Sequence, residues 1–105
     1  MRIALIHALP VSIAPVEEAF ERLWPEASTV NLTDDSLAGD LAAAGTLQPE
    51  MTDRFLALAR YSAMSGADAI LFTCSAFGPC IEACQEELAP LPVLKPNEAL
   101  IERCA

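Results

Sequence analysis

Basic side chains are scarce in this sequence of 105 residues. Six lysines and arginines stand against fifteen aspartates and glutamates, which gives a formal net charge of -9 at pH 7. Nucleic acids and anionic membrane surfaces both attract lysine and arginine. We therefore expect neither nucleic acid nor a membrane among the partners of this chain.

Long apolar runs are missing as well. No window of the sequence reaches the length of apolar chain that spans a bilayer. The apolar stretch after Arg2 meets His7 and Pro10 too soon to act as a secretory signal. We therefore expect a cytoplasmic protein, in which cysteines remain free thiols rather than disulfides.

Ligand sets for metals and motifs for common cofactors are also absent. Cys80 and Cys84 would share one helix face, but zinc needs two more ligands, and the single histidine, His7, is far away in the sequence. No Gly-x-Gly-x-x-Gly, P-loop or Cys-x-x-Cys pattern occurs, so nucleotide binding and thioredoxin-like redox chemistry have no motif support. We expect neither a metal nor another cofactor.

What the sequence does contain is a short apolar run, AILFT at 69–73, with a cysteine directly after it. The run is rich in strand formers and lies between Gly66 and the pair Gly78-Pro79. Such a run is typical of a central strand in a parallel sheet, buried on both faces. Cys74 and Ser75 follow it, at the carboxyl end of the strand, where open α/β sheets bind their ligands.

Strands and helices alternate along the whole chain. We expect strands at 2–8, 28–32, 69–73 and 92–94, and helices at 15–24, 49–65, 79–88 and 96–104. Residues 33–48 are expected to form a long loop with at most one helical turn at 41–44, either a binding loop or a surface excursion. This order predicts one α/β domain over residues 1–105, a four-stranded, mainly parallel sheet with helices on both faces.

Two of the expected helices carry apolar positions at helical spacing, which gives each of them one apolar face. In the helix at 15–24 these positions are Val16, Phe20, Leu23 and Trp24. In the helix at 49–65 they are Met51, Phe55, Leu58, Ala59 and Met64.

The strongest candidate site residue is Cys74, which is either a reactive thiol or a small buried hydrophobe. Its place at a strand end favours function, and a helix N-terminus nearby would lower the pKa of its thiol. The backbone N–H groups of Ser75, Ala76 and Phe77 follow it and can hold a carboxylate or an oxyanion.

For each of the other polar residues at the same edge, a structural role is the alternative to catalysis or ligand binding. We expect His7 to be a hydrogen-bonded group at a strand end rather than a base. Ser12 is expected to cap a helix rather than to bind a ligand. Asn31 and Asn97 either bind a polar group or close turns. The remaining thiols are expected in the core or on the surface of helices: Cys80, Cys84 and Cys104.

Three segments together resemble the aspartate/glutamate/hydantoin racemase superfamily: the opening RIALIHALPVSIAPVEEAFERLWPEASTVNLTDDSL, the turn FTCSAFGP and the late PVLKPNEA. The turn is the most specific, because the family places a reactive cysteine just after that strand. The resemblance implies enzymes without pyridoxal phosphate or metal, built from two similar α/β lobes that each contribute one cysteine to a cleft. One thiolate removes the proton α to a carboxylate, and the other thiol returns a proton on the opposite face.

For this chain, the resemblance implies a racemase or isomerase of amino acids or related small carboxylates. Cys74 matches the catalytic cysteine of the first lobe, and Ser75 with Ala76 matches the turn that holds the carboxylate. Pro10 and Ser12 lie where the family's first strand-to-helix loop meets the substrate. Asn97 lies in a comparable loop after the fourth strand.

The length of the chain departs from the family pattern. Members are about twice as long, and their second cysteine lies in the second lobe, a role that Cys80, Cys84 and Cys104 do not fit. Two-base chemistry needs an acid and a base on opposite faces of one carbon. We therefore expect either the N-terminal lobe of a larger enzyme or a half-length protein that forms a homodimer. The alternative is a catalytically incomplete lobe that binds a carboxylate or a partner chain.

Overall fold

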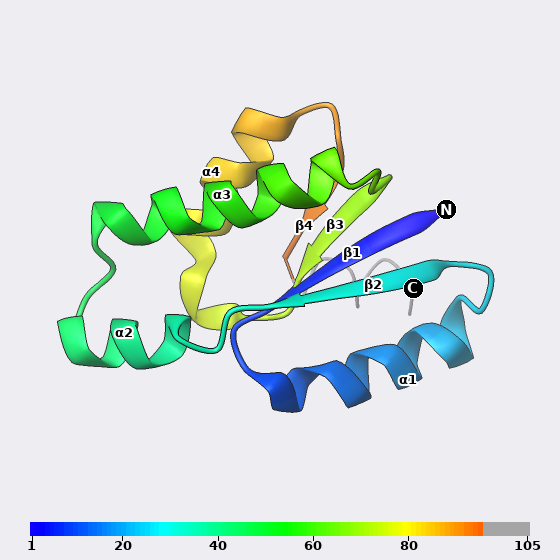
Figure 1. Ribbon diagram of the computed structural model, residues 1–105, viewed down its shortest axis with the longest axis horizontal. Helices are drawn as coiled ribbons and strands as arrows, with labels where there is room; N and C mark the ends of the chain where they lie inside the picture. The colour runs from blue at the N-terminus through cyan, green and yellow to red at the C-terminus, as the bar shows by residue number, and fades with distance from the viewer. Residues whose placement is uncertain (96–105) are drawn as a thin grey trace.

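The computed structural model describes residues 1–95 and shows an α/β fold around a parallel sheet (Figure 1). Its four strands are β1 (Arg2–His7), β2 (Ser28–Thr33), β3 (Ala69–Phe72) and β4 (Val93–Leu94). They lie in the order β2-β1-β3-β4, and every neighbouring pair is parallel. The predicted fold class is confirmed. The helix expected at 96–104 lies outside the described residues.

Helices cover both faces of the sheet. A short 3₁₀ helix (Pro10–Ser12) leads into α1 (Ile13–Leu23), which lies on one face. On the other face lie α3 (Pro49–Met64) and α4 (Gly78–Leu88), side by side (Figure 1). Because β1 and β3 are the two inner strands, helices and neighbouring strands shield them, and they carry most of the buried strand residues.

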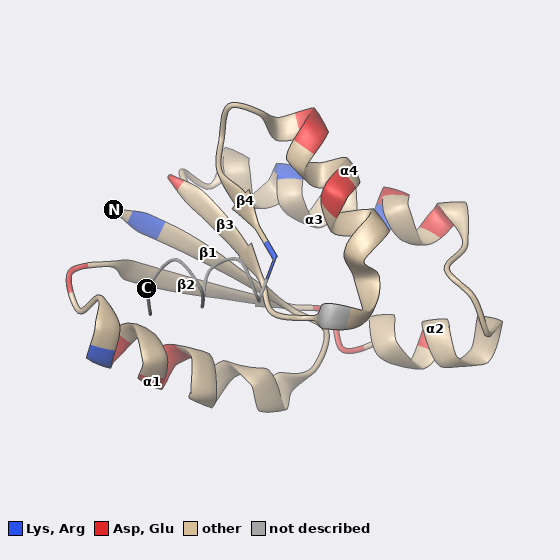
Figure 2. Ribbon diagram, turned by 180° about the vertical axis from the view of Figure 1, so that it is seen from behind, with Lys and Arg blue, Asp and Glu red and all other residues tan. Residues whose placement is uncertain are grey.

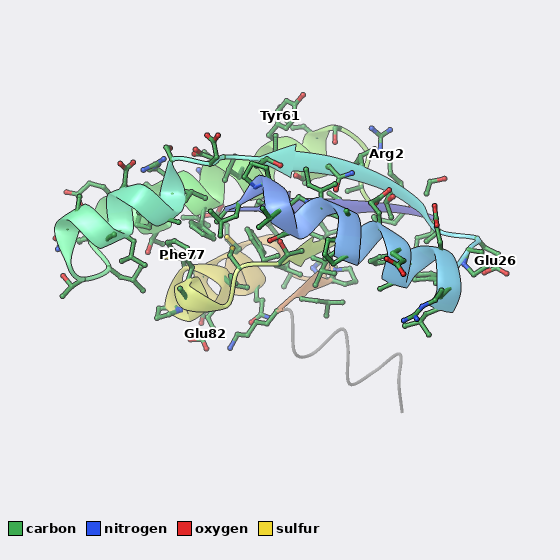
Figure 3. The ribbon with its side chains drawn as sticks, turned by 90° about the horizontal axis from the view of Figure 1, so that it is seen from below. Arg2, Glu26, Tyr61, Phe77 and Glu82 are labelled. Carbon is green, nitrogen blue, oxygen red and sulfur yellow. The ribbon has the colours of Figure 1, made fainter. Side chains whose placement is uncertain are left out.

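One apolar cluster lies on each face of the sheet, because successive strand residues point to opposite sides. On the α1 side, β1 and β3 contribute Ile3, Leu5, Ala69 and Leu71. On the α3 and α4 side, the largest buried side chains are the rings of Phe55, Phe72 and Phe77. Phe77, labelled in Figure 3, lies just before α4, whereas Glu82 projects outward from that helix.

Two residues of the expected apolar helix faces do not lie in the core. Leu23, at the end of α1, is 42% exposed, although Val16, Phe20 and Trp24 pack against the α1-side cluster. Met64, the last residue of α3, is 80% exposed. Leu23 lies at the C-terminal end of α1. The buried positions of α3 are Met51, Phe55, Ala59 and Ser62. Met64 lies about half a turn away from Phe55 around this helix, so it faces solvent.

Acidic residues lie along α1, α3 and α4 (Figure 2), and all of them are exposed except the half-buried Glu17, which accepts a hydrogen bond from the Thr29 hydroxyl of β2. Arg60 of α3 donates two hydrogen bonds to the carboxylate of Glu87 on α4, at 2.5 and 2.7 Å. Lys95 pairs with Glu82 at 2.6 Å. Within residues 1–95, no helix combines the length and the hydropathy needed to cross a bilayer.

The loop expected at 33–48 contains a helix, so that prediction is wrong. This helix, α2 (Leu37–Ala44), buries Leu37 completely and ends at Gly45, whose φ of 81° is the left-handed conformation that glycine adopts at helix ends. The prediction failed because Gly39 and Asp40 are poor helix formers. Contacts to α3, far away in the sequence, compensate for them.

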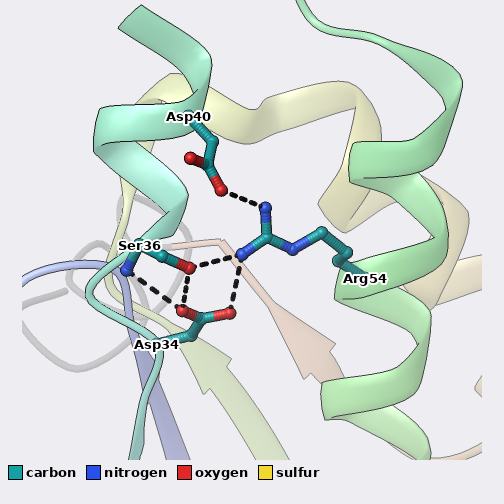
Figure 4. A network of polar contacts seen from close by, with 4 residues as sticks. All are labelled: Asp34, Ser36, Asp40 and Arg54. Atoms are coloured by element: carbon teal, nitrogen blue, oxygen red, sulfur yellow. Dashed lines mark hydrogen bonds and ion pairs between the residues drawn. The ribbon is translucent and has the colours of Figure 1, made fainter. Parts of the chain in front are cut away.

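These contacts are a polar network around Arg54 of α3 (Figure 4). The guanidinium donates to Asp40 at 2.7 Å, to Asp34 at 3.0 Å and to the Ser36 hydroxyl at 2.6 Å. The Ser36 hydroxyl and backbone N–H both donate to the Asp34 carboxylate, at 2.5 and 3.0 Å. The network therefore fixes the start and the middle of α2 against α3.

Acid is expected to weaken this network. The hydrogen bond from the Ser36 hydroxyl, helped by Arg54, holds the pKa of Asp34 below its ordinary 3.8. A depressed folded pKa contributes stability above the unfolded pKa, and this contribution is lost as the pH falls through the folded value. Asp34→Asn should therefore cost about 0.5–1 kcal/mol near neutral pH, since the pair is partly exposed, and almost nothing near pH 2. Urea denaturation of both proteins at the two pH values measures this; an equal cost at both would contradict it.

Candidate functional site

The loops after β1 and β3 leave the sheet next to each other. Ile6 pairs with Phe72 in the parallel register, and the backbone N–H of Thr73 donates to the carbonyl oxygen of Ile6 at 3.0 Å. The loop after β1 contains Pro10 and Ser12, and the loop after β3 contains Cys74. The structure therefore brings these expected site residues to one edge of the sheet, while Asn97 lies outside the described residues.

Cys74 is half-buried directly after β3. Its side chain packs against the apolar cluster on the α3 and α4 side. Burial, and then the nearby Cys80, raises the pKa of its thiol to about 11, against a backbone hydrogen bond that lowers it. The predicted lowering of this pKa by a helix N-terminus is therefore wrong. A 3₁₀ helix, Ser75–Phe77, separates Cys74 from the first turn of α4, and desolvation outweighs the helix dipole.

The other expected residues lie in the two loops at this edge. Ser75 begins the 3₁₀ helix and Ala76 is exposed within it. Pro10 is exposed in the loop after β1. Ser12 directly precedes α1, but its hydroxyl makes no capping hydrogen bond, so the capping role expected for it is wrong. Its backbone N–H instead donates to Leu9 at 3.1 Å, which closes the turn after β1.

A polar cluster lies at the same edge, in which one buried ring, His7, contacts the partly buried Thr73 and the exposed Asn31. His7, the last residue of β1, is fully buried. Its Nδ1 lies 2.8 Å from the Thr73 hydroxyl and its Nε2 lies 2.7 Å from Oδ1 of Asn31. His7 is thus a hydrogen-bonded group at a strand end, as expected. Sequence reasoning missed Thr73 as its partner, although a hydroxyl closing an apolar run directly before Cys74 was the available signal.

Among the three cysteines in the described part of the chain, Cys74 is the accessible one. Cys80 and Cys84 are buried in the core on α4. Cys80 Sγ lies 3.5 Å from the Thr52 hydroxyl, and burial raises the pKa of Cys84 to about 12. Residues 1–95 hold no cluster of three or more histidine, cysteine or acidic side chains arranged for a metal ion.

An open hollow also lies along α4, lined by Pro79, Glu82, Ala83, Gln85 and Glu86. Two of these five residues are acidic and none is basic. Lys95 pairs with Glu82, and Glu86 keeps the lining net acidic, which disfavours a carboxylate there. The edge at Cys74, with backbone N–H groups following the thiol, therefore suits a small anionic ligand better.

Comparisons of the chain with protein-family models, with curated protein sequences and with solved structures found no match. The chemistry of the sheet edge at Cys74 is therefore the main indication of function. That chemistry is a protonated, half-buried thiol beside a turn of backbone N–H groups.

Proposed function

We propose that this chain is a cofactor-independent racemase or isomerase of amino acids or related small carboxylates, acting by thiol-mediated proton transfer. The observation that carries the proposal is the half-buried thiol of Cys74 at the carboxyl end of the inner strand β3. The resemblance of the turn FTCSAFGP to the aspartate/glutamate/hydantoin racemase superfamily supports the same chemistry.

Cys74 is suited to the role of acid. With a pKa of about 11, its thiol is protonated at neutral pH. When the α-carbon of a bound carboxylate carries negative charge, the proton moves from Sγ to that carbon and leaves a thiolate. Backbone N–H groups of Ser75 and Ala76 would hold the substrate carboxylate, which also stabilises the charge that develops beside it.

The base that removes the original proton must lie on the opposite face of the same carbon. We propose that a second lobe or a second copy of the chain supplies it. Leu9 and Val11, in the loop after β1, are 47% and 77% exposed at this edge, and a second copy would cover them. In a twofold dimer the two Cys74 side chains would face each other, one as thiol and one as thiolate.

A second candidate function is that of a catalytically incomplete lobe that binds a carboxylate or a partner chain. The raised pKa of Cys74 favours this candidate too, because a thiolate base is rare at neutral pH when the pKa is about 11. Such a lobe binds carboxylates without exchanging their protons.

Proton exchange in D₂O separates the two candidates. The chain is incubated with aspartate, glutamate and related carboxylates, and loss of the α-proton signal is followed by NMR at several protein concentrations. Light scattering on the same samples gives the native mass. The enzyme predicts exchange that rises more steeply than the protein concentration as dimers form. Carboxylate binding without exchange in a populated dimer favours the binding lobe.

A further inference from the structure

One side chain, His7, joins the carboxyl ends of three neighbouring strands. It closes β1 and contacts Asn31 of β2 and Thr73, which follows β3. Both contacts are short, at 2.7 and 2.8 Å, and the ring is fully buried. No buried side-chain nitrogen or oxygen among residues 1–95 lacks a hydrogen-bond partner. The ring is therefore held from both sides.

The direction of each hydrogen bond follows from the chemistry of the partners. Oδ1 of Asn31 accepts only, so Nε2 of the ring carries the proton that bridges them. In the neutral ring, Nδ1 is then an acceptor, and the Thr73 hydroxyl donates to it. The Thr73 hydroxyl also lies 3.4 Å from the carbonyl oxygen of Ile6, so the shorter contact to His7 is the closer of two that tie the Thr73 side chain to β1.

His7 and Cys74 act from opposite faces of the sheet. Thr73 and Cys74 are successive residues after a strand, so their side chains diverge. Cys74 packs toward α3 and α4, whereas His7 lies in the alternation of β1 with Ile3 and Leu5, on the α1 side. His7 therefore reaches the thiol only through the Thr73–Cys74 backbone.

We propose that His7 is a positioning residue that, through the Thr73 hydroxyl, fixes the chain at Cys74 and sets how deeply the thiol is buried. The benefit of fixing Cys74 in place rests on the proposed function, because a proton donor needs a fixed position relative to the reacting carbon. The arrangement itself is tested without any substrate.

The test uses Thr73→Val, which removes the hydroxyl and keeps the shape of the side chain, and Thr73→Ser, which keeps the hydroxyl. Alkylation of Cys74 by iodoacetamide is measured near pH 8 in the folded chain by peptide mapping, with Cys84 in the same samples as a reporter of global opening. We expect Thr73→Val to speed alkylation of Cys74 by about threefold or more, with Cys84 unchanged and Thr73→Ser close to wild type.

Asn31→Ala is a second variant, on the edge strand β2, in case Thr73→Val does not fold. It removes the other partner of the ring, and we expect a change of Cys74 alkylation in the same direction. Unchanged alkylation of Cys74 in the folded variants, or a parallel rise at Cys84, would overturn the positioning role. A lack of proton exchange in wild type would instead count against the proposed function and leave this result standing.

Discussion

Replacing Cys74 with alanine is expected to lower the rate of α-proton exchange by about 100-fold or more, because the variant has no acid at the end of β3. The substitution should leave the fold intact, since the side chain is small and only half-buried. Exchange is measured by NMR in D₂O at matched protein concentrations, and the rate is divided by the folded fraction from circular dichroism.

Cys84→Ala is the matched control for this variant. Cys84 is a fully buried thiol on α4, away from the carboxyl edge, so its loss should lower stability by about 1–2 kcal/mol. The exchange rate per folded molecule should stay at the wild-type value. Near-normal exchange in Cys74→Ala would show that another group donates the proton.

Phe55→Ala is expected to lower the free energy of unfolding by about 3–5 kcal/mol. The ring is fully buried on α3, with centroids 5.3 Å from Phe72 and 4.8 Å from Phe77. Phe72 ends β3 and Phe77 ends the 3₁₀ helix after Cys74. Phe55 therefore anchors the chain on both sides of the thiol, and its loss removes a large part of the stability of a domain this small.

Phe20→Ala provides the comparison, measured by urea denaturation alongside Phe55→Ala. Phe20 lies on α1, is only partly buried and stacks on Trp24 at 6.2 Å. We expect its substitution to cost about 1–2 kcal/mol, because less apolar surface is buried there. Equal costs for the two variants would contradict a core centred on the three phenylalanines.

The alternation of apolar runs and amphipathic segments was sufficient to predict the parallel sheet and three of the four described helices. It failed at α2, where Gly39 and Asp40 lower the intrinsic helix propensity. Burial of Leu37 and the ion pairs of Arg54 stabilise that helix. These are tertiary contacts across many residues of sequence, which a local pattern does not contain.

The position of Cys74 at the carboxyl edge could be predicted, because it follows from a strand end in a parallel sheet. The direction of its pKa shift could not, since it depends on how deeply neighbouring elements bury the thiol. The contact between His7 and Thr73 depends on the register of β1 against β3, which the sequence of either strand alone does not specify. The racemase activity stays a prediction.

The most direct test of Cys74 as the acid is the pH dependence of its alkylation in the folded chain. Iodoacetamide reacts with the thiolate, so the rate follows the ionised fraction of this cysteine. Peptide mapping separates Cys74 from the other thiols. We predict a midpoint near the pKa of about 11 that burial gives the Cys74 thiol, with slow reaction at neutral pH. A midpoint at or below neutral pH would show that Cys74 rests as a thiolate, which contradicts its role as proton donor and fits a base instead.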